Sequence, residues 1–139
     1  SSTGWGGTLA SATAITANTS YFMNQLHCTY AAFLFATLEG ISKVGTYTGT
    51  GNDLNVTDLG AAARFVLIKR TDTNSDWYTY DSTRGIVAGN DPYFFMNSSA
   101  VQVTNTDYID PHSSGFTITS SAPDALNASG GTYLYLAFA

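Results

Sequence analysis

The stretch RFVLIKRTDTNSDWYTYD, residues 64–81, reads as two β-strands joined by a turn. Its first run, residues 64–69, is apolar on both faces, which is typical of a central strand in a sheet covered on both sides. Its second run, residues 77–81, alternates Trp, Thr and Asp with two tyrosines. Asp, Asn and Ser between the two runs are common turn formers. The stretch therefore predicts a β-hairpin in the middle of the chain.

Thr, Ser, Asn and Gly are abundant in the rest of the chain, and Glu39 is its one glutamate. These residue types are poor in helix interiors and good in strands and turns. Short runs of strand character lie between turn clusters, at residues 30–38, 43–48, 85–88, 93–96, 116–119 and 132–138. We therefore expect an all-β fold, a two-sheet antiparallel β-sandwich of jelly-roll or concanavalin-like type.

Two of these runs carry further information. Residues 30–35 are apolar on both faces and predict a second central strand. Residues 132–138 alternate, so that two leucines and Phe138 lie on the face opposite two tyrosines.

Residues 1–29 fit the sandwich least well, and we interpret them as an N-terminal arm or the end of a preceding unit, with the β-sandwich domain at residues 30–139. Such an arm usually lies against its own domain or a neighbouring subunit. Residues 28–36 resemble residues 131–139, either because buried strands look alike or because the chain is one link of a tandem array. The arm carries large apolar residues: Trp5, Leu9, Ile15, Tyr21, Phe22 and Met23.

The chain of 139 residues is 44% hydrophobic and 11% charged, so it has the size of one domain with its own core. Its net charge is −5, and its five basic residues are scattered along the sequence. Nucleic acids and anionic membranes bind clustered Lys and Arg, so neither is an expected partner. The longest apolar run is half the length of a membrane-spanning helix, and we expect a soluble protein.

Cys28 is the single cysteine, so no internal disulfide is expected, and one thiol cannot build a zinc site without three more ligands. We interpret it as a small buried hydrophobe. His27 precedes it, but adjacent residues of a strand point to opposite faces, so the histidine cannot easily activate the thiol.

Asp72, Asn74 and Asp76 alternate in the turn of the hairpin and copy the opening of a calcium-binding loop. An EF-hand would need Gly at the sixth position and Glu at the twelfth, where this chain has Trp77 and Thr83. A plain hairpin turn explains the same residues. We therefore expect no bound metal.

An acid, a histidine and two serines adjoin in Asp110-Pro111-His112-Ser113-Ser114. A catalytic triad needs members brought together from separate segments, which neighbours joined through a proline cannot provide. The sequence has no Gly-x-Ser-x-Gly elbow, and its single glutamate leaves a glycosidase dependent on two converging Asp. We therefore expect no enzyme, no catalytic residue and no cofactor.

The aromatic residues Trp77, Tyr78 and Tyr80 allow two interpretations. Exposed aromatics stack on sugars in carbohydrate-binding sandwiches, although core packing and subunit contacts use them more often. Arg84 follows them, and we expect it to pair with Asp81 rather than to bind a ligand.

Three segments carry a family resemblance: LFATLEGISKVGTYTGTGN (residues 34–52), RFVLIKRTDTNSDWYTYDSTRGIVAGNDPYFFMNSSA (residues 64–100) and SSGFTITSSAPDALNASGGTYLYLAFA (residues 113–139). In this order they resemble a family of β domains in tail-fibre and other structural proteins of tailed bacteriophages, including phages of marine and cyanobacterial hosts. The resemblance covers about three-quarters of the chain and leaves the arm out. It implies a sandwich fold and a structural role in the virion, and it supplies no catalytic residue.

We therefore expect a structural protein of a tailed-phage virion, located in a tail fibre or spike or on the particle surface, that acts by assembly. Its expected partners are other virion proteins and copies of itself, in a homo-oligomer for which the resemblance favours a trimer. The alternative is a lectin-like module that binds host-surface glycan during host attachment.

Overall fold

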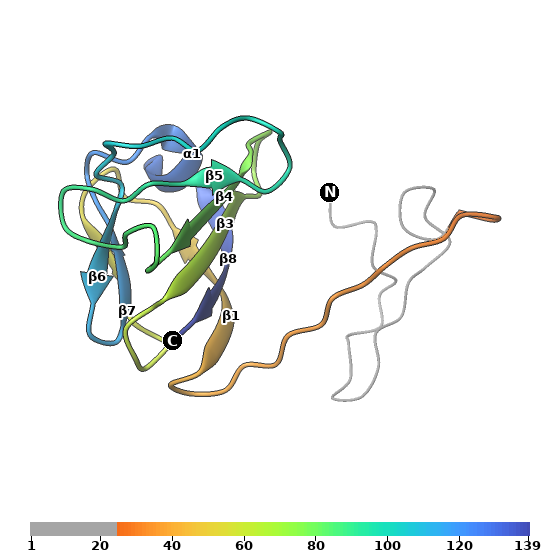
Figure 1. The fold of residues 1–139 in the computed structure, drawn as a ribbon, viewed down its shortest axis with the longest axis horizontal. Coiled ribbons are helices and arrows are strands. Elements are labelled where there is room, and N and C mark those ends of the chain that lie inside the picture. The colour runs from red at the N-terminus through yellow and green to blue at the C-terminus, as the bar shows by residue number, and fades with distance from the viewer. Residues whose placement is uncertain (1–24) are drawn as a thin grey trace. The chain divides into compact units, whose positions relative to one another are not determined.

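The computed structural model describes residues 25–139, of which Phe35–Ala139 form a compact unit (Figure 1). Within the described residues, no helix is long and apolar enough to cross a membrane. The elements are β1 (Ser42–Thr48), β2 (Leu54–Val56), β3 (Phe65–Arg70), β4 (Trp77–Asp81), β5 (Phe94–Phe95), β6 (Ile109–His112), β7 (Gly115–Ile118), the short helix α1 (Asp124–Asn127) and β8 (Thr132–Phe138).

The strands form two antiparallel sheets. One sheet has five strands in the order β1-β8-β3-β4-β5, and the other has three strands in the order β2-β7-β6. The predicted hairpin is confirmed, because β3 and β4 pair with Ile68 opposite Tyr78. The last strand, β8, lies between β1 and β3, so Tyr135 faces Gly45 on one side and Ile68 on the other.

The two sheets share one core. Ile109 and Ile118 of the three-stranded sheet are fully buried together with Val66 and Ile68 of the five-stranded sheet. Phe116 of β7 packs edge-on against a tyrosine of β8, with 5.5 Å between the ring centroids. The protein is therefore an all-β sandwich, as the sequence predicts.

Two strands predicted from the sequence are not formed. Residues 30–37 have no strand pairing, and only Leu38 makes an isolated bridge, to Ser42. We assigned residues 30–35 to a central strand, but β8 lies between β1 and β3 in the five-stranded sheet. An apolar pattern predicts that a segment is buried, but it does not specify which strands pair with it. Residues 85–88 form no strand either, since the chain turns at Gly85, whose N–H donates to the Asp81 carbonyl.

Two short strands were not predicted. β2 has three residues, too few to show a period of two. β6 contains Pro111, which argues against a strand in the middle of a sheet. Because β6 is the last strand of its sheet in the order β2-β7-β6, the missing N–H of the proline is tolerated there.

Candidate functional site: the outer face of the five-stranded sheet

The five-stranded sheet turns one face to the core and the other away from it, and we call the second the outer face. In β8, Tyr133 and Tyr135 are buried, whereas Leu134 and Leu136 remain partly exposed. The strand register places further side chains on the side of these leucines. The main side chains of the outer face are Val44, Thr46, Phe65, Leu67, Trp77, Thr79, Phe94, Leu134, Leu136 and Phe138.

The tyrosines of β8 line the core because their hydroxyl groups find partners at its edge. Tyr133 Oη donates to the Asp124 carbonyl at 2.6 Å and accepts the N–H of Ala128 at 2.8 Å. Tyr135 Oη donates to the Asp58 carboxylate. Burial raises the pKa of both tyrosines, so both remain protonated donors at neutral pH. These two rings of β8 therefore fill the core without leaving their own hydroxyls unpaired.

Asp58, which accepts the hydrogen bond from Tyr135, is itself held by an ion pair. The Lys43 ammonium lies 3.1 Å from its Oδ2. Burial opposes ionisation, but the hydrogen bond from Tyr135 and the ammonium hold the pKa of Asp58 below its ordinary value. The charged Asp58 carboxylate thus links Tyr135 of β8 to Lys43 of β1 on the core side of the sheet.

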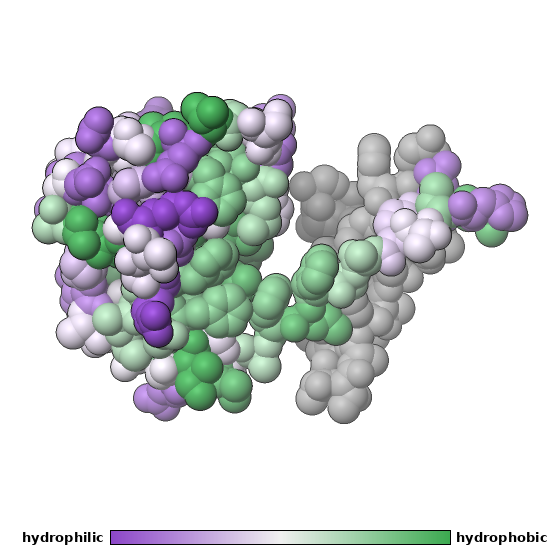
Figure 2. Space-filling view, viewed as in Figure 1, coloured by the Kyte–Doolittle hydropathy of each residue, from purple (hydrophilic) through white to green (hydrophobic). Residues whose placement is uncertain are grey.

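The outer face is apolar and incompletely covered. Figure 2 shows hydrophobic side chains gathered over the region where Figure 1 draws β3, β8 and β1. Phe138 contacts Phe65 and Phe35, with ring centroids 5.8 Å and 5.7 Å apart. Val44 is 39% exposed. Exposed apolar patches of this kind mark interaction sites, and we treat the outer face as the candidate functional site.

The outer face also buries a hydroxyl group without a partner. Thr79 is 1% exposed, and its Oγ1 has no hydrogen-bond partner among the described residues. A buried unpaired hydroxyl costs stability, and the hydroxyl of Tyr80 in the core is likewise buried without a partner among the described residues.

The aromatic residues of β4 divide between the two faces. Tyr78 and Tyr80 are buried in the core, whereas Trp77 lies partly exposed on the outer face. Arg84 pairs with Asp81, as predicted, and its guanidinium carbon lies 5.0 Å from the centre of the Phe94 ring. Of the three aromatics considered for sugar stacking, the structure leaves one accessible.

A second exposed apolar surface lies before the compact unit, and we call residues 26–34 the apolar segment. Leu26, Phe33 and Leu34 are 80%, 83% and 70% exposed, and Tyr30 is also exposed. Cys28 is exposed, so its interpretation as a buried hydrophobe is wrong. The reason is that the strand expected to bury it does not form. The arm residues named in the sequence analysis, Trp5 to Met23, lie outside the described residues.

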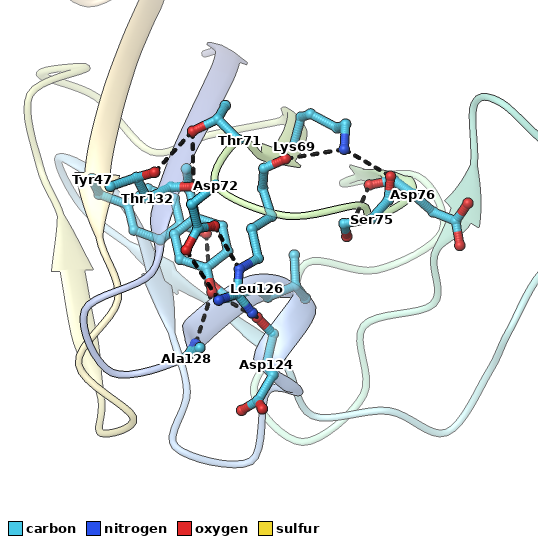
Figure 3. Close-up of polar contacts among 12 residues, drawn as sticks. Tyr47, Lys69, Thr71, Asp72, Ser75, Asp76, Asp124, Leu126, Ala128 and Thr132 are labelled. Atoms are coloured by element: carbon cyan, nitrogen blue, oxygen red, sulfur yellow. Dashed lines mark hydrogen bonds and ion pairs between the residues drawn. The ribbon is translucent and has the colours of Figure 1, made fainter. Parts of the chain in front are cut away.

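The turn considered for calcium is held by groups of the protein (Figure 3). Arg70 Nε donates to Asp72 Oδ1 at 2.7 Å, and this hydrogen bond lowers the pKa of Asp72. Lys69 Nζ donates to the Ser75 carbonyl at 2.7 Å, and Asp76 accepts from an asparagine side chain. Lysine and arginine therefore engage the oxygens of this turn. In the part of the chain that the structure describes, no three His, Cys, Asp or Glu side chains gather in a metal-binding group.

Asp110 and His112 lie in β6, and Ser113 and Ser114 form the turn after it. The N–H of Ser114 donates to His112 Nδ1 at 3.1 Å. Burial raises the pKa of Asp110, and its Oδ1 has no partner among the described residues. The imidazole therefore bonds to its own turn, and the described contacts include no hydrogen bond from it to a serine hydroxyl or to Asp110.

Asp91 is a buried carboxylate that the sequence analysis missed. Its oxygens accept the N–H groups of Tyr108 at 2.9 Å and Ile109 at 3.1 Å. Burial raises its pKa to about 7, against these hydrogen bonds and with the help of the charges of Asp107 and Asp110. In the sequence, Asn-Asp-Pro has the signature of an exposed turn, and no residue pattern distinguishes this aspartate from the others.

A family model described as a domain of unknown function, DUF7483, matches residues 1–139. The chain belongs to the DUF7483 family. No curated protein and no solved structure matches it. Because the DUF7483 match spans the whole sequence, it includes both the apolar segment and the sheet that forms the outer face.

Proposed function

We propose that this protein is a structural component of a tailed-phage virion, part of a tail fibre or spike or a decoration of the particle surface, and that it acts by assembly. Its partners are copies of itself and other virion proteins. The virion assignment rests on the segments at residues 34–52, 64–100 and 113–139, which resemble domains of phage structural proteins. The observation that carries assembly is the apolar, partly exposed outer face.

The chemistry of the outer face suits a protein contact. Interface centres are depleted in charged residues and enriched in aromatic ones, and the outer face has Phe65, Trp77, Phe94 and Phe138. Burying such side chains yields about 25 cal/mol for each Å² of apolar surface removed from water. The outer face therefore has the composition of an interface centre.

The proposal is tested on purified particles of a phage that encodes this chain. Quantitative peptide mass spectrometry should detect the chain at several copies per particle, at a fixed ratio to the known tail and capsid proteins. Density-gradient fractions without particles are the control. A chain that is synthesised during infection but absent from purified particles would overturn the virion assignment.

Glycan binding is the second candidate function. It is favoured by Trp77, which is partly exposed on the same face of the sheet as Phe94. Assembly is supported more strongly, because Tyr78 and Tyr80 are used in the core. A glycan array with the intact chain tests this candidate, and binding to a defined bacterial surface glycan would establish it.

A further inference from the structure

We infer that the outer face binds the apolar segment, residues 26–34, of a second copy of this chain. The inference rests on the proposed function, because it names the contact by which copies would assemble. It follows from four observations: where the chain enters the outer face, what the two surfaces are made of, how large they are, and what a single copy leaves exposed.

The chain enters the compact unit on the outer face. Phe35, the first residue of this unit, packs edge-on against Phe138. The contact is fixed by Ser42, whose Oγ donates to the Ala36 carbonyl and whose backbone N–H and C=O both bond to Leu38, all at 2.8 Å. The outer face thus already accepts a phenylalanine from this stretch of sequence.

The two surfaces match in chemistry. Residues 28–38 contain no charged residue, and Phe33 and Leu34 continue the apolar character of Phe35. At the ends of the outer face, the charges are engaged within the protein: Lys69 bonds to carbonyls of its own turn, and Asp81 pairs with its neighbour Arg84. Contact between the surfaces therefore buries apolar groups without stripping water from an unpaired ion.

The two surfaces also match in size. Strands lie about 4.8 Å apart, so five strands span about 19 Å from the first to the last. An extended chain rises about 3.3 Å per residue, so six residues cover about 20 Å. The apolar segment is thus long enough to cross the whole outer face.

Each of the two surfaces carries exposed apolar side chains. Phe33 and Leu34 are among the most exposed apolar residues described, while Leu134 and Leu136 of the outer face are partly exposed. If each copy gives its apolar segment to a neighbour and receives one in return, both surfaces are buried in every copy. Such an exchange gives a closed symmetric oligomer when the two copies exchange with each other or the rotation between neighbours closes a ring.

Self-association of the full chain tests the inference, measured by sedimentation equilibrium. Phe33→Ser removes an anchor of the apolar segment, and Leu136→Thr changes the outer face while retaining a residue that favours strands. Each should weaken association at least about tenfold, as expected for a buried interface anchor. Val101→Ser, at an equally exposed residue in the loop after β5, is the control and should change nothing. A wild-type chain that stays monomeric at millimolar concentration would overturn the inference.

Cross-linking distinguishes a second copy from the same chain. Two single-cysteine variants, Phe33→Cys and Leu136→Cys, are each made with Cys28→Ser, mixed, and oxidised with diamide. The inference predicts a disulfide-linked heterodimer, identified by mass, that exceeds the yield obtained with Val101→Cys in place of Phe33→Cys. In a chain that carries both new cysteines, an internal disulfide that excludes the dimer would show that the segment folds onto its own sheet, and would overturn the inference. A chain that associates in this way but is absent from particles would overturn the virion assignment alone.

Discussion

The two faces of the five-stranded sheet are made from the same strands but carry opposite surfaces. On β8, the tyrosines face the core and the leucines face outward, although leucine is the more hydrophobic side chain. Tyr133 and Tyr135 can go inside because their hydroxyls bond to Asp124, Ala128 and Asp58 at the edge of the core. On β8, hydrogen-bond partners thus allow the tyrosines to be buried, and the apolar side that remains is left for another contact.

The two faces should differ most in how much stability is lost when neighbouring residues of β3 are truncated to alanine. Ile68 is fully buried, so Ile68→Ala should lower the free energy of unfolding by about 3 kcal/mol. Leu67 is partly exposed on the outer face, and Leu67→Ala should cost about 1 kcal/mol. Urea unfolding at low protein concentration measures both. Equal losses would mean that the single chain buries both faces alike.

The free energy of unfolding should depend on pH because the buried Asp91 carboxyl has a raised pKa. The pKa of Asp91 is about 7 in the folded protein and near 3.8 in a solvated carboxyl. The folded state therefore holds a proton that the unfolded state releases, and the free energy of unfolding should fall as pH rises from about 4 to about 7. Asp91→Asn should flatten this slope, measured by urea unfolding across the pH range.

Asp58→Asn is the matched control for this pH dependence. Because the pKa of Asp58 is lowered in the folded protein, its contribution is lost only as pH falls below about 4. The Asp58 variant should therefore keep the slope between pH 4 and 7. If it loses the slope while Asp91→Asn keeps it, the assignment to Asp91 is wrong.

Removing one hydroxyl from each face should have opposite effects. Tyr47 Oη donates to the Leu126 carbonyl at 2.7 Å, so Tyr47→Phe should destabilise the protein by about 1 kcal/mol. Thr79 Oγ1 is buried without a partner among the described residues, so Thr79→Val should leave stability unchanged or raise it by up to about 1 kcal/mol. Thermal unfolding of both variants gives the comparison, and a clear loss with Thr79→Val would reveal a hydrogen bond on the outer face.

Trp77→Ala should have the smallest effect on the fold. The side chain is partly exposed, and we expect a loss of about 1 kcal/mol or less. The same variant distinguishes whether the Trp77 ring contributes to assembly or to glycan binding. If copies assemble through the outer face, self-association weakens, whereas loss of binding on a glycan array with unchanged association would favour the lectin-like function.

The sequence was sufficient for the fold class because strand periods and turn residues are local signals. The hairpin of residues 64–81 follows from an apolar run, an alternating run and the Asp, Asn and Ser between them, and the strand at residues 132–138 follows from alternation. Residues 30–35 carry the same apolar signal but form no strand, since pairing depends on distant residues that local pattern does not specify.

The candidate site was harder to predict. Alternating residue types along a strand indicate that its two faces differ, but they do not show which face is buried. The inward orientation of Tyr135 depends on Asp58, which is distant in sequence and whose role only the fold reveals. The burial of Asp91 depends in the same way on the backbone of Tyr108. The pairing of Arg84 with Asp81 was predictable because those residues are three positions apart.

Hydroxyl-radical footprinting of the unmodified chain tests the central claim most directly. Oxidation of Leu134, Leu136 and Phe65 is measured by peptide mass spectrometry at low and high protein concentration, with the exposed Val87 and Val101 as internal references. The division of roles between the two faces predicts that the outer-face residues become protected as concentration rises, together with Phe33, while the reference valines do not change. Equal oxidation of the outer face at every concentration would contradict its role as the surface through which copies assemble.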